Sequence, residues 1–188
     1  MDVCRARSSL VWGWLCVGLG LIFAATDIVG SGLADARLGV GVGTCIALVG
    51  IAVYLRPAVL IGDDGVVFRN VVGTASAPFS RIREVSMRWS LEVLGDDGRK
   101  ASAFAAPASR GARTGIFGND AAEGSMVEDR EGRPDTTGSR LYDAWQSWKD
   151  SHRGEADTTA SSISRGVDVK GIGLLVAAAI ALVFAFLG

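Results

Sequence analysis

Three long stretches of the chain carry no charged residue, and they lie towards its two ends. They cover residues 8–26, 38–55 and 171–188, and most of their residues are apolar or glycine. A helix of this length rises about 27 Å, close to the ~30 Å hydrocarbon core of a bilayer. Only a helix satisfies all its backbone polar groups within a single such segment. The pattern therefore predicts three transmembrane helices.

The first run could alternatively be a cleaved signal peptide. Arg5 and Arg7 form a basic start, and Ala34-Asp35-Ala36 resembles a small-residue cleavage site. That site lies well beyond the apolar run, however, and a second apolar run begins immediately after it. We expect the first span to be retained.

Basic residues near the ends of the runs predict the orientation, because Lys and Arg concentrate in cytoplasmic loops. The loop between the first two runs holds Arg37 alone, so 18 of the 19 Lys and Arg residues fall on the opposite side. We expect a multi-pass plasma-membrane protein with a cytoplasmic N-terminus and middle segment and an extracytoplasmic C-terminus. The flanking cytoplasmic residues would be Arg5, Arg7, Arg56, Arg69, Arg165 and Lys170.

Small residues suggest how the first two spans pack. Gly39 and Gly43 form a GxxxG pattern in the second span, and Gly20 and Ala24 form a small-residue edge on the first. Such positions let helix backbones approach closely in lipid. We expect packing within the hairpin rather than a dimer interface. Because the three runs contain no charge, they lack the side chains that usually serve proton relay, ion conduction or transport.

The segment after the second run has the pattern of β-strands. Residues 58–61 and 66–72 are apolar and rich in β-branched side chains, and Gly62-Asp63-Asp64-Gly65 between them predicts a hairpin turn. From residue 84 to residue 93 polar and apolar residues alternate strictly. That alternation predicts a strand in a sheet with one buried face.

A second turn is predicted at Asp96-Asp97-Gly98, followed by a returning strand over residues 99–104. Both Asp-Asp-Gly turns could alternatively bind a metal. Calcium loops of the helix–loop–helix type need acidic ligands at alternating positions and a closing Glu, which neither stretch has. We therefore expect exposed turn tips, with no metal site and no acid–base role.

Beyond these strands the composition changes. Residues 106–137 are rich in Gly, Ala, Ser and mixed charges, which predicts a mobile insertion. An amphipathic helix should follow, with Ser139 as a candidate N-cap. It could lie on the membrane surface, but its polar face is not Lys-rich, so docking against the sheet is expected. The apolar positions of this helix are Leu141, Ala144, Trp145 and Trp148. Residues 151–170 would then form a long flexible linker to the third span.

Charge and reactive residues narrow the function classes. The net charge of −1 gives no field that would steer the protein to nucleic acid. Cys16 and Cys45 lie in apolar runs and Cys4 stands alone, so passive thiols are favoured over a metal or disulfide role. The single histidine, His152, lies in a polar stretch without the buried partners that a general base needs. We expect no enzyme, no catalytic residue, no metal and no cofactor.

Several short motifs lie along the predicted strands and turns, namely Arg56-Pro57, Gly65-Val66, Arg69-Asn70, Pro78-Phe79, Ile82, Val85 and Asp97-Gly98-Arg99. In these motifs the chain is similar to small membrane-anchored pleckstrin-homology-like (PH-like) proteins of actinobacteria. Strands joined by hairpins and closed by one amphipathic helix also resemble a PH-like domain. This resemblance implies an α+β fold, with an antiparallel β domain over residues 56–150 between the hairpin of residues 1–55 and the third span, but it implies no activity.

Four arginines are candidate functional residues. Arg81, Arg83 and Arg88 could contact anionic lipid or a partner, although basic residues barely outnumber acidic ones over residues 56–105 and form no cluster. Arg56 should anchor the second span at the membrane interface. The sequence favours a non-catalytic interaction module that the bilayer holds and that binds a membrane or cytoplasmic protein. The alternatives are a structural small subunit of a larger membrane complex and a weak anionic-lipid-binding domain.

Overall fold

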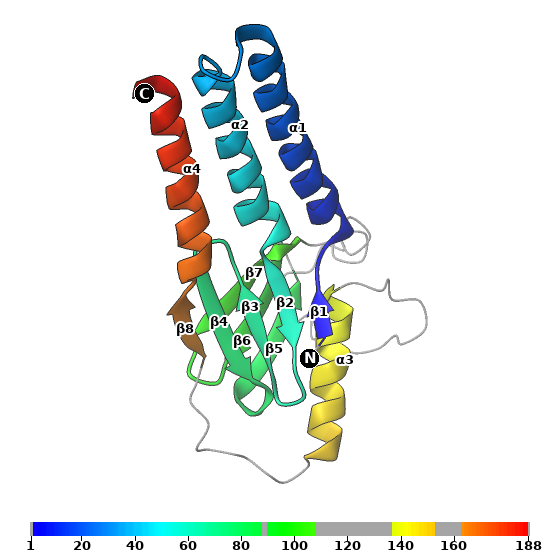
Figure 1. The fold of residues 1–188 in the computed structure, drawn as a ribbon. Coiled ribbons are helices and arrows are strands. Elements are labelled where there is room, and N and C mark those ends of the chain that lie inside the picture. Colours follow the sequence, from blue (N-terminus) through cyan, green and yellow to red (C-terminus); the bar gives the residue numbers. More distant parts are fainter. Residues whose placement is uncertain (1, 88–89, 108–136, 153–162, 188) are drawn as a thin grey trace, which may run out of the picture.

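The computed structural model describes residues 2–87, 90–107, 137–152 and 163–187 of the chain. Within this part the chain is α+β, and a helical bundle stands on one end of a β domain (Figure 1). The helices are α1 (Arg7–Ser31), α2 (Arg37–Gly50) with its π-helical extension η1 (Ile51–Leu55), α3 (Thr137–Ser151) and α4 (Val169–Leu187). The strands are β1 (Asp2–Cys4), β2 (Ala58–Ile61), β3 (Gly65–Arg69), β4 (Gly73–Pro78), β5 (Ile82–Met87), β6 (Ser90–Gly95), β7 (Lys100–Pro107) and β8 (Ser164–Val167), and the 3₁₀ turn η2 (Phe79–Arg81) precedes β5.

Three helical segments are long and apolar enough to cross a membrane, namely Ser8–Ser31, Arg37–Leu55 and Val169–Leu187. They match the three predicted runs. Because β1 pairs with β2, the start of the chain lies with the β domain. The α1–α2 connection and the C-terminus lie at the far end of the bundle (Figure 1). The N-terminal strand and the β domain are therefore on the same side of the three helices.

Helix α1 continues past the predicted end of the first run at residue 26 and includes Asp27. A hydrogen bond to α2 accommodates the charge of the Asp27 carboxylate. Its Oδ2 accepts a hydrogen bond of 2.6 Å from the backbone N–H of Gly39, in the first turn of α2. An unpaired N–H at a helix start is a natural partner for a carboxylate. Asp27 thus caps the second helix of the hairpin from the end of the first.

Small residues bring α1 and α2 together, as the sequence predicted. A Cβ atom added at Gly20 would collide with the backbone oxygen of Gly43, and one added at Gly43 would collide with that of Gly20. Ala24 and Ala47 flank this contact. The predicted Gly43 position therefore serves packing within the hairpin.

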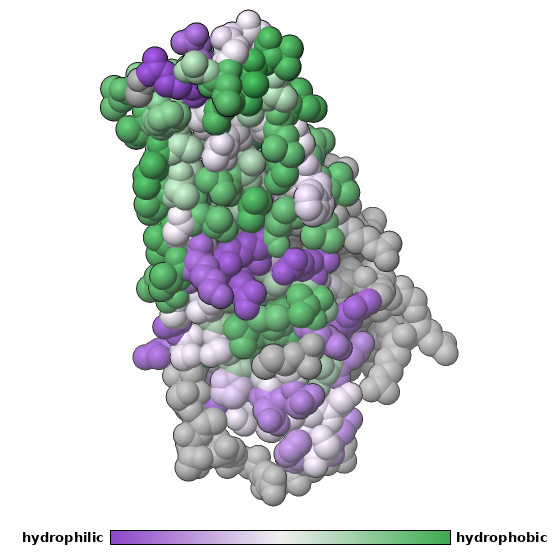
Figure 2. Space-filling view, viewed as in Figure 1, coloured by the Kyte–Doolittle hydropathy of each residue, from purple (hydrophilic) through white to green (hydrophobic). Residues whose placement is uncertain are grey.

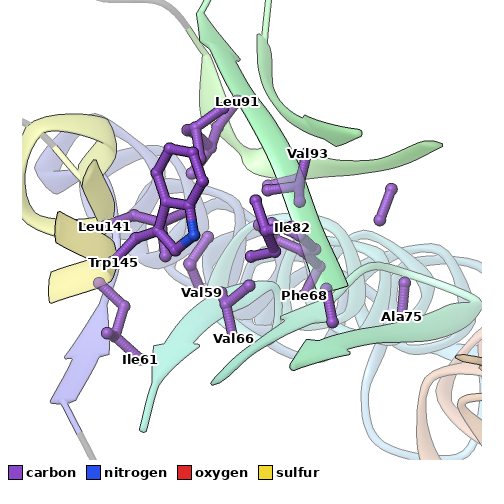
Figure 3. Close-up of a cluster of buried hydrophobic side chains, with 14 of the residues drawn as sticks. Val59, Ile61, Val66, Phe68, Ala75, Ile82, Leu91, Val93, Leu141 and Trp145 are labelled. Atoms are coloured by element: carbon purple, nitrogen blue, oxygen red, sulfur yellow. The ribbon is translucent and has the colours of Figure 1, made fainter. Parts of the chain in front are cut away.

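All strand pairs are antiparallel, and they form two sheets. One sheet has the order β1-β2-β3-β4-β8, and the other has the order β5-β6-β7. Val59, Val66 and Phe68 of the first sheet face Leu91 and Val93 of the second across a buried core (Figure 3).

Helix α3 closes this core, which confirms its predicted docking. Leu141 and Trp145 point from α3 into the space between the sheets (Figure 3) and are buried. The indole Nε1–H of Trp145 donates a 3.3 Å hydrogen bond to the backbone oxygen of Phe79, which satisfies its polar atom. Ser139 is not the N-cap, because α3 begins at Thr137 and Ser139 is buried within its first turn.

The alternation over residues 84–93 correctly predicted a buried face, since Val85, Leu91 and Val93 are buried. The prediction of a single strand is wrong, because two strands occupy this stretch. β5 ends at Met87 and β6 begins at Ser90, with Val85 opposite Val93 and Met87 opposite Leu91. From the Glu84–Leu94 pair to the Met87–Leu91 pair, the numbers of the paired residues differ by an even number. Alternation therefore keeps its phase through the turn, and the pattern gives no sign that the chain reverses.

The predicted flexible linker over residues 151–170 is also partly wrong. α3 runs to Ser151, Ile163 is buried in the core, and β8 pairs with β4. The side chain of Arg165 further donates a 2.7 Å hydrogen bond to the backbone oxygen of Lys100 in the second sheet. Strand β8 thus pairs with the edge of β4 that would otherwise be open. The insertion predicted over residues 106–137 lies outside the described residues except at its two ends, which belong to β7 and α3.

Candidate functional site

The arginines that the sequence singled out do not gather at one place. Arg81 lies at the end of η2, where its Nε is 3.0 Å from Asp96 Oδ2, in an ion pair that lacks hydrogen-bond alignment. Arg83 is exposed on β5, and Arg88 lies outside the described residues. Their contact with lipid or a partner stays a prediction.

Arg56 lies at the junction between η1 and β2 and forms an ion pair with Asp168, the residue before α4. Its Nε donates a 3.1 Å hydrogen bond to Asp168 Oδ2, and its Nη2 donates to Oδ1. The Arg56 side chain is 18% exposed and that of Asp168 is 6% exposed. The pair joins the end of the second candidate span to the start of the third, which the sequence did not reveal.

Two further contacts hold Asp168. Its Oδ1 accepts a 3.2 Å hydrogen bond from the backbone N–H of Gly171, so that it caps α4, and its own N–H donates to Val72 O at 3.0 Å. Burial by itself raises the pKa of this carboxyl. The hydrogen bonds from Arg56 and Gly171, and the charges of Arg56 and Arg69, outweigh burial and lower the pKa of Asp168 below its ordinary value. Asp168 is therefore ionised near neutral pH and fixed in place.

A groove of about 470 Å³ opens at the end of the β domain away from the Arg56–Asp168 pair, where the β2–β3 turn approaches α3. Its apolar lining is Ile61, Phe79, Ala144 and Trp148. Ile61 and Phe79 belong to the core, and the rings of Phe79 and Trp148 lie 6.3 Å apart. The backbone N–H of Phe79 donates a 2.8 Å hydrogen bond to Asp64 O, which fixes the turn against this floor.

The rim of the groove is acidic. Asp2, Asp63 and Asp64 are exposed and line it, and none of the three forms an ion pair with another described residue. In the described part of the chain no group of three or more His, Cys, Asp or Glu side chains is placed to hold a metal ion. The arrangement suits a partner that carries cationic side chains beside an apolar one.

His152 lies at the same groove, directly after the last turn of α3. Its ring stacks on Trp148 with centroids 4.6 Å apart and planes at 12°, and its Nδ1 lies 3.1 Å from Trp148 O. The polar neighbours of His152 in the sequence gave no indication of this aromatic contact. The i, i+4 spacing of Trp148 and His152 on one helix was the available signal.

Asp63 and Asp64 were predicted as exposed turn tips, and the structure confirms that exposure and the hairpin between β2 and β3. Their proximity to α3 and to Asp2 was missed, because Asp2 precedes the first candidate span and α3 follows 73 residues after Asp64. Comparisons with models of known protein families, with curated proteins and with solved structures find no match for this chain.

Proposed function

We propose that this chain is a membrane-tethered interaction module, in which a PH-like domain on the cytoplasmic face binds a segment of a protein partner. The groove between the β2–β3 turn and α3 is the observation that carries the proposal. Two antiparallel sheets closed by one helix support the PH-like assignment. The length and apolar composition of the three helical segments support the tether.

The orientation follows from the placement of charge. The β domain and the N-terminal strand lie on the same side of the bundle, and 18 of the 19 Lys and Arg residues belong to that side by sequence. Cytoplasmic segments carry this excess in multi-pass proteins. The groove lies at the end of the domain remote from the bundle of α1, α2 and α4, since β2 leaves that bundle and Asp63 and Asp64 follow the far end of β2.

The occupant that fits the groove is an exposed protein segment with an apolar side chain flanked by Lys or Arg. Trp148, whose ring packs on the buried ring of Phe79, would receive the apolar side chain, and the three carboxylates would face the cations. Complementary charge of this kind gives selectivity and a faster encounter. An aromatic floor is typical of sites that carry most of the binding energy.

The proposal is tested with a photo-crosslinking amino acid at Ser147, which lines the groove, in the full-length protein in its own membrane. We expect an adduct with one protein partner. Its yield should fall by roughly tenfold in D63K/D64K, because attraction to a cationic segment becomes repulsion. The control E84K/E92K changes the net charge by the same amount as D63K/D64K, but on strands β5 and β6. It should leave the yield unchanged.

An adduct that forms equally in D63K/D64K would contradict the groove as the binding site. The same crosslinking residue at Val176, which is exposed on α4, separates the module from a subunit of a membrane complex. If the partner is captured from Val176 and not from Ser147, the helices rather than the domain make the interaction, and the proposal is wrong.

A further inference from the structure

A second pocket lies on the opposite side of the β domain, at the level where the domain meets α4. Its volume is about 360 Å³, near the lower end of the ~300–1,000 Å³ of small-molecule pockets. It is lined by the end of β3, the start of β4 and the β8–α4 junction. Its charged residues are Arg56, Arg69, Asp168 and Lys170. Figure 2 shows hydrophilic residues gathered directly below the apolar helices.

The charges in this pocket do not cancel. Asp168 is neutralised by its paired hydrogen bonds with Arg56. Arg69 and Lys170 have no ion pair with any other described residue. Two positive charges therefore remain beside the hydroxyl-bearing side chain of Thr74, which is opposite Arg69 in the β3–β4 pairing. This set of donors fits a phosphate group.

The surroundings of the pocket place that phosphate at a membrane. Val72, in the turn between β3 and β4, is 54% exposed, and Val169, the first residue of α4, is 76% exposed. The turn is held at this level, because the N–H of Asp168 bonds to Val72 O and because Gly171 leaves room for Val71 O. The candidate span Val169–Leu187 begins at the same point. Exposed valines next to uncompensated cations are typical of a surface that meets both acyl chains and headgroups.

We infer that this junction pocket, formed by Arg69, Lys170 and Thr74, binds the headgroup phosphate of an anionic phospholipid. The ligand is a lipid rather than a soluble phosphate, because the pocket lies at the start of a candidate span and is flanked by exposed apolar side chains. The site differs from the predicted lipid contacts at Arg81, Arg83 and Arg88, which lie on η2, on β5 and outside the described residues. It also differs from the acidic groove, and it holds whichever side of the membrane the domain occupies.

The test uses the purified full-length protein in phosphatidylcholine vesicles that contain a trace of spin-labelled phosphatidylglycerol or of spin-labelled phosphatidylcholine. The measurement is the fraction of each lipid that the protein immobilises. We expect the wild type to prefer phosphatidylglycerol. K170Q should reduce this preference by up to about fivefold, and R69Q/K170Q should abolish it. R83Q/K100Q removes two exposed cations elsewhere in the domain and should leave the preference intact.

Equal immobilisation of the two lipids by the wild type would overturn the inference. So would an equal loss of preference in R83Q/K100Q, since the attraction would then be a property of the net charge. Loss of the preference on adding excess glycerol phosphate would show that the pocket takes a soluble phosphate instead of a lipid. Lys170 is exposed and outside the core, so K170Q tests the pocket without disturbing the fold.

Discussion

Replacing Asp168 by alanine should destabilise the β domain and loosen its attachment to α4. The carboxylate accepts hydrogen bonds from Arg56 and from the N–H of Gly171. Removing one partner of a buried ion pair costs about 3–5 kcal/mol, and losing a helix N-cap costs about 1 kcal/mol. Arg56 is 18% exposed and retains some hydration after the substitution. We therefore expect D168A to lower the free energy of unfolding by about 3 kcal/mol.

The measurement is the urea midpoint of the full-length protein in detergent micelles, followed by tryptophan fluorescence. Trp12 and Trp14 lie on α1 and are replaced by Phe in every variant, so that the signal comes from the remaining tryptophans. R56A, D168A and the double variant form a cycle that isolates the interaction energy between the two side chains. The double variant should be less destabilised than the sum of the single ones by at least about 1 kcal/mol.

The same pair predicts a dependence on pH. The folded-state pKa of Asp168 lies below its ordinary value, so its contribution to stability is complete above pH ~4. That contribution should be lost as the pH falls through the lower folded pKa, and D168N should not show this loss. A destabilisation of D168A below about 1 kcal/mol, with no coupling to Arg56, would refute the view that this pair fastens the domain to the helices.

Three other substitutions test the packing. Each is followed by the same urea unfolding measurement, or by the association of helices α1 and α2 in detergent. Leu141→Ala should lower stability by about 2–5 kcal/mol, because the side chain is fully buried between the sheets. Gly43→Ala should weaken the α1–α2 contact by about 1–3 kcal/mol, because its Cβ would meet the backbone of Gly20, whereas Gly18→Ala meets open space and serves as the control. Asp27→Ala removes the cap of α2 and should cost about 1 kcal/mol.

Hydropathy and turn chemistry were enough to locate most of the architecture. The three candidate spans follow from runs long enough to match a bilayer, and the β2–β3 hairpin follows from Gly62-Asp63-Asp64-Gly65. The buried face of α3 follows from the spacing of Leu141 and Trp145. In each case the determining residues are neighbours in sequence, so that a local pattern carries the information.

The features that were missed depend on distant partners. Cys4 is buried in the core because β1 pairs with β2. In the sequence, the whole α1–α2 hairpin lies between these two strands. Ile163 and β8 are ordered because β4 offers an open edge, and nothing in their own composition indicates a strand. The acidic groove combines Asp2, the β2–β3 turn and α3, and the junction pocket combines β3, β4 and α4. The residues of neither site could be grouped together from the sequence alone.

The central claim, that three helices cross the membrane and leave the β domain in the cytoplasm, is tested most directly by labelling single cysteines in intact cells. In a variant without native cysteines, one cysteine is placed at Leu33 between α1 and α2, at Asp64 in the β2–β3 turn, or after Gly188. A membrane-impermeant maleimide should label the first and third positions in intact cells and Asp64→Cys only after disruption. Labelling of Asp64→Cys in intact cells would contradict the account.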